Sequence, residues 1–100
     1  AALTVDEEKK LTEEALKDMG KEYPPVKDQR LAAYINKLGQ KLVQANKLNG
    51  NPYNYRFTVT DVPMVNAFAL PAGSIYITTP IIAMAESEAE IAGVLGHEIG

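Results

Sequence analysis

The chain contains one histidine, His97, and Glu98 follows it directly. On a helix, His-Glu is the first half of H-E-x-x-H, in which two histidines four residues apart face the same way and bind one zinc ion. The glutamate of that motif serves as general base toward the water that attacks a peptide carbonyl. Ile99 and Gly100 would fill the two middle positions, so the second histidine would fall after Gly100. His97 is therefore a candidate zinc ligand and Glu98 a candidate catalytic base.

The helix that should carry this pair is marked by its start and by its small residues. Ser87 and Glu90 have the spacing of a capping box, which predicts a helix start there. Glycines at 93, 96 and 100 each cost a helix about 1 kcal/mol relative to alanine. We therefore expect a bulky group or another backbone to lie against this helix near His97. A plainer interpretation stays open, because a lone histidine on a mostly apolar helix is usually a packed or hydrogen-bonded structural residue.

Residues 1–49 are predicted to be helical. Thr4 and Glu7 form another capping box at the start of a first helix, which Gly20 is expected to end. Asp28 is expected to cap a second helix. Gly39 lies inside that helix and should either weaken it slightly or allow close packing. The apolar stripe of the second helix is Leu31, Ile35, Leu38 and Leu42.

Residues 50–79 are predicted to form three short strands. The first contains an alternating apolar set, Tyr55, Phe57 and Val59. The second covers 66–70, and the third covers 75–79, which is mostly β-branched and aromatic. Residues 80–100 then hold a short helix, capped by Thr79 with Pro80 at its first position, and the helix of His97. The fold class is α+β: two helices, a small three-stranded sheet, and then the helix with the candidate site.

Composition limits the classes of function. At 100 residues, of which 46% are hydrophobic, the chain is long enough for one small packed domain at most. Its net charge of −3 gives no reason to expect nucleic acid or an anionic membrane as partner. The absence of cysteine excludes disulfides and thiolate metal sites. No apolar run reaches the length of a membrane span, and no signal peptide is visible.

The stretch 66–100 holds several short motifs that occur together in one known family. Asn66-Ala67-Phe68 matches a strand of the family pattern, and 71–75 (PAGSI) matches its next turn and strand, with alanine in place of the first glycine. Glu88, Glu90 and His97-Glu98 match the acidic start of the active-site helix and the first half of its metal motif. With these motifs, the stretch resembles the M48 zinc metallopeptidases, and the resemblance is close over the C-terminal third of the chain. The N-terminal helices are a looser match, of the kind found in soluble, envelope-located members.

The resemblance implies a zincin-like fold with two histidines and a later glutamate as zinc ligands. Only His97 and Glu98 carry over, and the resemblance implies that the other ligands follow Gly100. In zincins the substrate adds as a strand to the sheet edge before the active-site helix, so Asn66, Ala67 and Phe68 would border the substrate cleft. Asn66 has an equally good interpretation as a turn residue that bonds its own backbone, and Phe68 as a core residue.

These observations lead to an expected function. The chain should be the N-terminal portion of one zinc endopeptidase domain, which cleaves internal bonds of unfolded or misassembled proteins in the bacterial periplasm or cell envelope. Its partners would be the polypeptide substrate and the remainder of the domain, and membrane association of a longer protein stays open. With one imidazole, the chain alone should be inactive. The alternatives are a non-catalytic M48-like module that binds unfolded or partner proteins, and an unrelated α+β domain in which His97 is structural.

Overall fold

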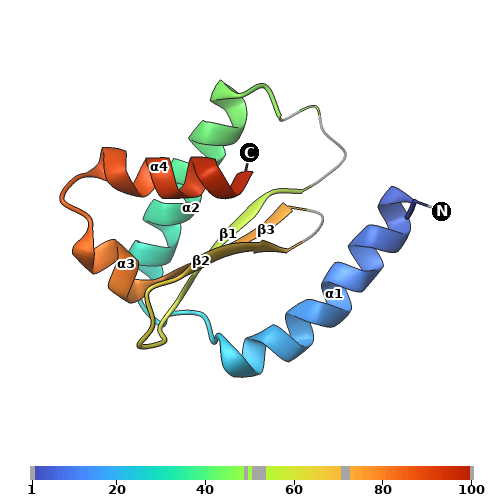
Figure 1. Cartoon of the computed structure of the whole chain (residues 1–100), viewed down its shortest axis with the longest axis horizontal. Coiled ribbons are helices and arrows are strands. Elements are labelled where there is room, and N and C mark those ends of the chain that lie inside the picture. Colours follow the sequence, from blue (N-terminus) through green and yellow to red (C-terminus); the bar gives the residue numbers. More distant parts are fainter. Residues whose placement is uncertain (1, 49, 51–53, 71–72, 100) are drawn as a thin grey trace.

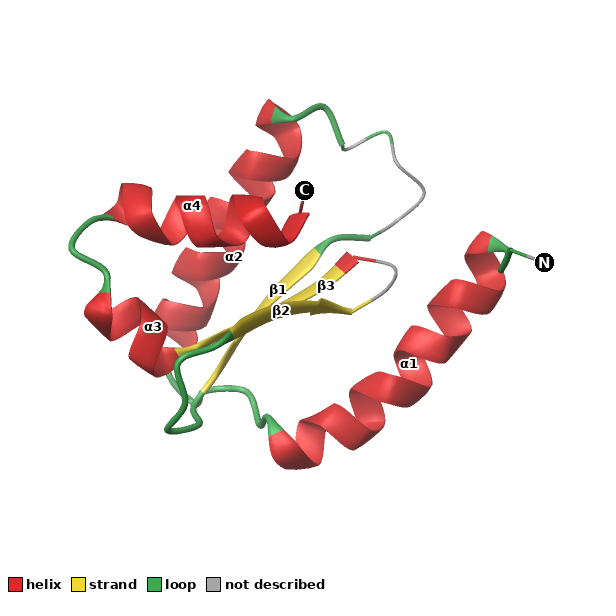
Figure 2. Cartoon of the chain, viewed as in Figure 1, coloured by secondary structure: helices red, strands yellow, loops and turns green. Residues whose placement is uncertain are grey.

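The computed structural model describes residues 2–48, 50, 54–70 and 73–99 of the chain. Its helices and strands follow the predicted order, and the α+β class is confirmed (Figures 1 and 2). The elements are α1 (Val5–Glu22), α2 (Gln29–Ala45), β1 (Arg56–Thr60), β2 (Ala67–Leu70), β3 (Ser74–Thr78), α3 (Thr79–Met84) and α4 (Glu88–Ile99). Among the described helices, none has both the length and the apolar content that crossing a membrane requires.

The three strands form one sheet in the order β1-β3-β2 (Figure 1). β1 runs parallel to β3, and β2 runs antiparallel to it. Every residue of β3 is buried, as expected for a central strand that is covered on both faces. β2 is therefore an edge strand, and its second edge has no strand beside it within the described residues.

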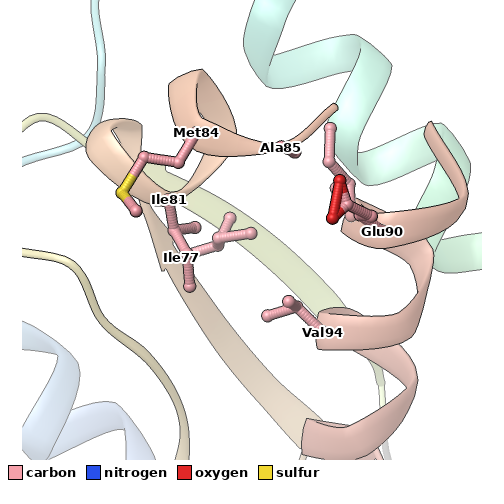
Figure 3. Close-up of a pocket in the computed structure, with 7 residues that line it drawn as sticks. Ile77, Ile81, Met84, Ala85, Glu90 and Val94 are labelled. Carbon is pink, nitrogen blue, oxygen red and sulfur yellow. The ribbon is translucent and has the colours of Figure 1, made fainter. Parts of the chain in front are cut away.

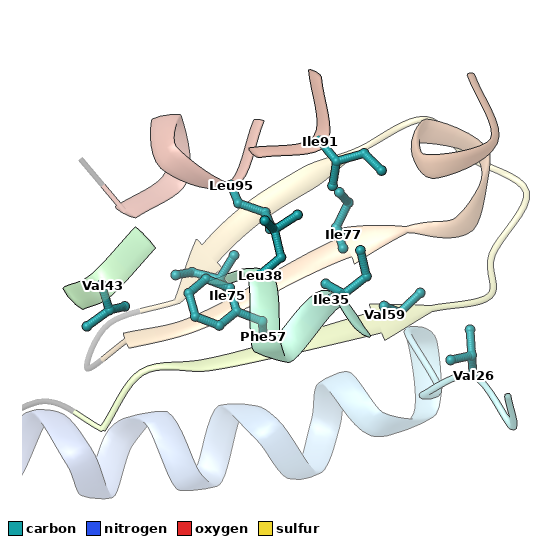
Figure 4. Close-up of a cluster of buried hydrophobic side chains, with 10 residues drawn as sticks. All are labelled: Val26, Ile35, Leu38, Val43, Phe57, Val59, Ile75, Ile77, Ile91 and Leu95. Atoms are coloured by element: carbon teal, nitrogen blue, oxygen red, sulfur yellow. The ribbon is translucent and has the colours of Figure 1, made fainter. Parts of the chain in front are cut away.

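The hydrophobic core lies between one face of the sheet and the helices α2 and α4 (Figure 4). α2 covers β1, whereas α4 lies over β2 and β3 and also packs on α2. At Gly39 the two layers come so close that the ring of Phe57 occupies the space of a side chain, so this glycine allows close packing. The buried core residues are Val26, Ile35, Leu38, Val43, Phe57, Val59, Ile75, Ile77, Ile91 and Leu95.

α1 lies on the opposite side of the sheet from α2 and α4 (Figures 1 and 4). Aromatic side chains of the sheet point to this side. The rings of Phe68 and Tyr76 stack with centroids 5.1 Å apart, and Tyr23 meets Phe68 edge-on at 5.1 Å. Burial raises the pKa of the Tyr76 phenol, and the positive charge of Arg56 offsets part of that rise. This cluster ties the end of α1 to the sheet.

The predicted helix starts are confirmed at α1 and α2. Glu7 donates its N–H to the Thr4 hydroxyl at 3.1 Å, and Thr4 donates its N–H to the Glu7 carboxylate at 3.2 Å. The Asp28 carboxylate accepts the amides of Arg30 and Leu31. The predicted end of α1 at Gly20 is wrong, because the helix continues to Glu22. Gly20 keeps a helical backbone, and the only described glycine with a positive φ is Gly73.

Boundaries in the C-terminal half differ from the prediction by one residue. β3 ends at Thr78, which is also the residue before α3, so Thr79 is the first helical residue rather than the cap. The Thr79 hydroxyl instead donates to the Asp61 carboxylate at 3.0 Å. At α4, Glu90 donates its N–H to the Ser87 hydroxyl as predicted, but its carboxylate accepts the amide of Glu86 rather than that of Ser87.

Candidate active site

The orientation of α4 is set by its contacts with α2 and the core. Tyr34 on α2 lies near the carboxylate of Glu88, the first residue of α4. Desolvation, the interaction with the Glu88 side chain and its charge all raise the pKa of Tyr34. Ile91 and Leu95 face the core. Glu90, which is about 200° farther around the helix than Glu88, therefore faces away from α2.

His97 lies on the part of α4 that is turned away from α2, whereas Glu98, seven residues after the buried Ile91, lies on the side of the helix that faces the core. His97 is three residues after Val94 and seven after Glu90, so these residues share one side of the helix. The His97 side chain is exposed and that of Glu98 is half-buried. Within the described part of the chain, neither side chain has a hydrogen-bond or ion-pair partner. These surroundings do not support the interpretation of His97 as a packed or hydrogen-bonded structural residue.

The small residues of α4 border an open surface. A side-chain carbon built at Gly93 or Gly96 would meet no atom within 4 Å. The expectation that a bulky group or another backbone lies against these glycines is therefore wrong for the described residues. Gly93 precedes His97 by one helical turn, so the open surface includes the candidate zinc ligand.

The predicted substrate residues lie at the start of β2. Asn66 is fixed through its backbone, since its N–H donates to the Thr78 hydroxyl at 3.0 Å. The carbonyl of Asn66 accepts from the Thr78 N–H and from the same hydroxyl, each at 3.0 Å. A bond from the Asn66 side chain to its own backbone, which the turn interpretation requires, is not found among the described residues. β2 thus starts at a defined register on β3.

That register decides which backbone groups face the free edge of the sheet. In an antiparallel ladder, hydrogen-bonded pairs alternate with pairs that point their N–H and C=O groups outward. Asn66 and Thr78 form a hydrogen-bonded pair, so the outward pairs are Ala67 with Ile77 and Ala69 with Ile75. Within the described part of the chain, Ala67 and Ala69 therefore offer unpaired backbone donors and acceptors at this edge. Their methyl side chains leave space for a second strand beside α4.

Phe68 points to the other face of the sheet. Its ring packs between Tyr23 and Tyr76, on the side of α1 rather than α4. The backbone of Phe68 belongs to a hydrogen-bonded pair with Tyr76 by the same alternation. The structure therefore brings Ala67 and its neighbour Ala69 toward α4, whereas Phe68 lies in an aromatic cluster.

α4 packs on β2, so the two predicted groups of site residues belong to adjacent elements. The sequence alone did not indicate two further residues in the region where α4 packs on β2. They are Ala69 on β2 and Val94 on α4. The alternation along 66–70 would indicate Ala69 only once the pairing with β3 is known. Val94 reads in the sequence as an ordinary member of the apolar flank.

The described residues include one candidate ligand for a zinc ion. A catalytic zinc has three protein ligands, with water or substrate in the fourth position. The exposed imidazole of His97 fits one of the three, and Glu98 beside it has the chemistry of a base. No three His, Cys, Asp or Glu side chains in the described ranges lie close enough together to hold a metal. These residues therefore fit one ligand position and do not complete the set.

Comparison with known proteins identifies the family. The family model described as Peptidase family M48 matches residues 29–100, which run from the start of α2 through α4. The chain belongs to peptidase family M48, and the resemblance predicted from the sequence is confirmed.

Three relatives of this chain have names that describe proteases. The β-barrel assembly-enhancing protease of Yersinia pestis is 30% identical over 99 residues, which cover 99% of this chain and 20% of that protein. The mitochondrial metalloendopeptidase OMA1 of Arabidopsis thaliana is 45% identical over 47 residues, covering 47% of this chain and 10% of OMA1. The metalloprotease YcaL of Escherichia coli is 34% identical over 76 residues, covering 71% of this chain and 29% of YcaL. The chain thus spans less than a third of each of these relatives.

Proposed function

We propose that this chain is the N-terminal portion of one zinc endopeptidase domain, which hydrolyses internal bonds of polypeptide substrates. One observation carries the proposal. His97 is exposed and Glu98 beside it is half-buried on α4, the helix that packs on the edge strand β2, in a chain that belongs to peptidase family M48.

Each site residue has a separate role in this proposal. His97 is one zinc ligand, and polypeptide outside these residues supplies the other two. When bound, zinc polarises the scissile carbonyl and activates the attacking water. Glu98 removes the proton from that water and passes it to the leaving amine. Ala67 and Ala69 bind the substrate backbone by strand addition, which holds the chain extended beside α4.

The substrate class follows from strand addition and from the names of the relatives. Binding through the backbone requires an extended segment, which unfolded or misassembled proteins offer. The name of the Yersinia protein, a β-barrel assembly-enhancing protease, supports a place in the bacterial periplasm or envelope. A net charge of −3 does not favour nucleic acid as a partner.

A second candidate function rests on the edge of β2 itself. The unpaired groups of Ala67 and Ala69 need no metal to bind an extended peptide. The chain could therefore belong to an M48-like module that binds unfolded or partner proteins without cleaving them. Zinc content and cleavage distinguish the two functions.

The test compares this chain with a longer natural protein that contains it. We expect about one zinc per molecule in the longer protein and cleavage of unfolded casein that a chelator stops. The variant Glu98→Gln should keep the zinc and lose cleavage by at least about 100-fold, the lower range for a general base. His97→Ala should lose both. The isolated chain should neither retain zinc nor cleave, because one imidazole is too few ligands.

Three outcomes would count against the proposal. Cleavage that survives in the Glu98→Gln variant would remove Glu98 as the base. A zinc content that is unchanged in His97→Ala would remove His97 as a ligand. A longer protein that binds unfolded casein but does not cleave it, with or without added zinc, would support the binding module instead.

A further inference from the structure

A pocket of about 220 Å³ lies beside the candidate site, between α3 and α4 (Figure 3). Ile77 of β3 forms its floor, α3 forms one wall and α4 the other. Glu90 is the only charged residue of the lining; the others are apolar. The lining residues are Ile77, Ile81, Met84, Ala85, Glu90, Ile91 and Val94.

The pocket continues the surface that carries His97 and Glu98. Val94 lines the pocket and precedes Glu98 by four residues, so their side chains are neighbours along one side of α4. Ile77 on the floor is the ladder partner of Ala67, whose backbone faces the free edge of β2. A strand added to that edge would therefore pass both the candidate metal ligand and the mouth of this pocket.

We propose that this pocket receives an apolar side chain of the substrate, within two residues of the cleaved bond, and rejects acidic side chains. The inference rests on the proposed peptidase function, since it assigns a substrate side chain to the same site. The volume supports a side chain as the occupant, because pockets for drug-sized ligands have about 300–1,000 Å³. The apolar walls favour aliphatic or aromatic groups by removing them from water.

Glu90 supplies the selection by charge. Its carboxylate accepts the backbone N–H of Glu86 at 2.6 Å, which fixes a negative group at the edge of the pocket. An Asp or Glu side chain in the pocket would lie close to that charge and would lose water, and both effects oppose its binding. Met84 forms the outer wall with a side chain that is 68% exposed, so truncating it enlarges the pocket at little cost to the core.

The first experiment maps cleavage sites in the longer protein. Unfolded proteins of known sequence are digested, and the products are identified by mass spectrometry. We expect one position within two residues of the cut to be enriched in Leu, Met and Phe and depleted in Asp and Glu. Replacing Leu by Ala at that position in a peptide should lower kcat/KM by at least about 10-fold.

Two pocket variants and two matched controls then locate the selection. Met84→Ala should shift the preferred side chain toward larger groups, and Glu90→Gln should raise cleavage of peptides with Glu at that position by roughly 10-fold. The control substitutions are Leu11→Ala and Glu13→Gln, at two positions of α1 on the other side of the sheet. They should leave the preference for substrate side chains unchanged. An active protein in which the pocket variants keep the preference of the unmodified protein would refute the pocket while leaving the proposed function intact.

A second experiment reports on the pocket without catalysis. In NMR spectra of the isolated chain, N-acetyl-leucinamide should shift the methyl signals of Ile77, Ile81 and Val94 in a saturable way, and N-acetyl-glutamic acid amide should not. The methyl signals of Ile35, a fully buried residue of α2, should stay in place. Equal shifts with both amides, or no saturable shift at these methyl groups, would overturn the proposed pocket whatever the protein cleaves.

Discussion

The close approach of α2 to β1 at Gly39 gives a sharp prediction about stability. A Cβ atom at position 39 would overlap three atoms of the Phe57 ring. That ring has little space to retreat, because Phe57 is 5% exposed and its amide donates to the Asn36 side chain at 3.4 Å. We therefore expect Gly39→Ala to destabilise the chain, although alanine is the better helix former.

The expected magnitude follows from two opposing contributions. Replacing glycine by alanine in a helix interior gains about 1 kcal/mol. Inserting a carbon into a packed core costs about 1–3 kcal/mol, and a rigid ring favours the upper part of that range. The net loss should be about 1–2 kcal/mol, which lowers the Tm of a domain of this size by about 4–8 °C per kcal/mol.

The assay is urea unfolding followed by circular dichroism, with Gly93→Ala as the matched control. That substitution makes the same chemical change in a helix, but its Cβ meets no atom within 4 Å. It should stabilise this chain by about 0.5–1 kcal/mol. Equal effects of the two substitutions, in either direction, would refute the assignment of the cost to the Phe57 ring. Adding Phe57→Leu to Gly39→Ala should recover part of the loss, as a double-mutant cycle would show.

Three further predictions concern the core, a helix cap and a titration. Leu95→Ala should lower the free energy of unfolding by about 2–5 kcal/mol, because Leu95 is fully buried. A loss below about 1 kcal/mol, measured by urea unfolding, would contradict the place of Leu95 in the core. Asp28→Ala removes the acceptor for two amides at the start of α2 and should cost about 1 kcal/mol, whereas Asp28→Asn should retain most of it; the two are compared by Tm. Glu88→Gln should lower the pKa of Tyr34 toward 10, measured by absorbance at 295 nm, since the charge that helps to raise it is removed. Because the folded-state pKa of Tyr34 is raised, its contribution to stability is present below pH 10 and is lost as the pH rises through the folded-state pKa. A Tyr34 titration that is unchanged in Glu88→Gln would contradict the influence of the Glu88 charge on Tyr34.

Errors in the predicted boundaries share one cause. Gly20 has the residue type of a helix end, yet α1 continues through it to Glu22. The helix ends at Tyr23 without a residue in the left-handed conformation, so the special property of glycine is not used. Thr79 has the residue type of a cap, yet Thr78, which pairs with Asn66, is the last residue of β3 and the residue before α3, so the helix starts one residue earlier, at Thr79. In both places a tertiary contact or its absence decided between two local options.

The sequence by itself determined the elements, their order and the family. Capping boxes, alternating strands and the His97-Glu98 pair are relations between residues a few positions apart, so they are visible along the chain. Only the tertiary structure decided which surfaces these elements present. The pairing of the strands determines four features: the central place of β3, the outward backbone of Ala67 and Ala69, the open face of α4 and the pocket beside Val94. Such pairings join residues far apart in the sequence, and their register depends on packing that no local pattern records.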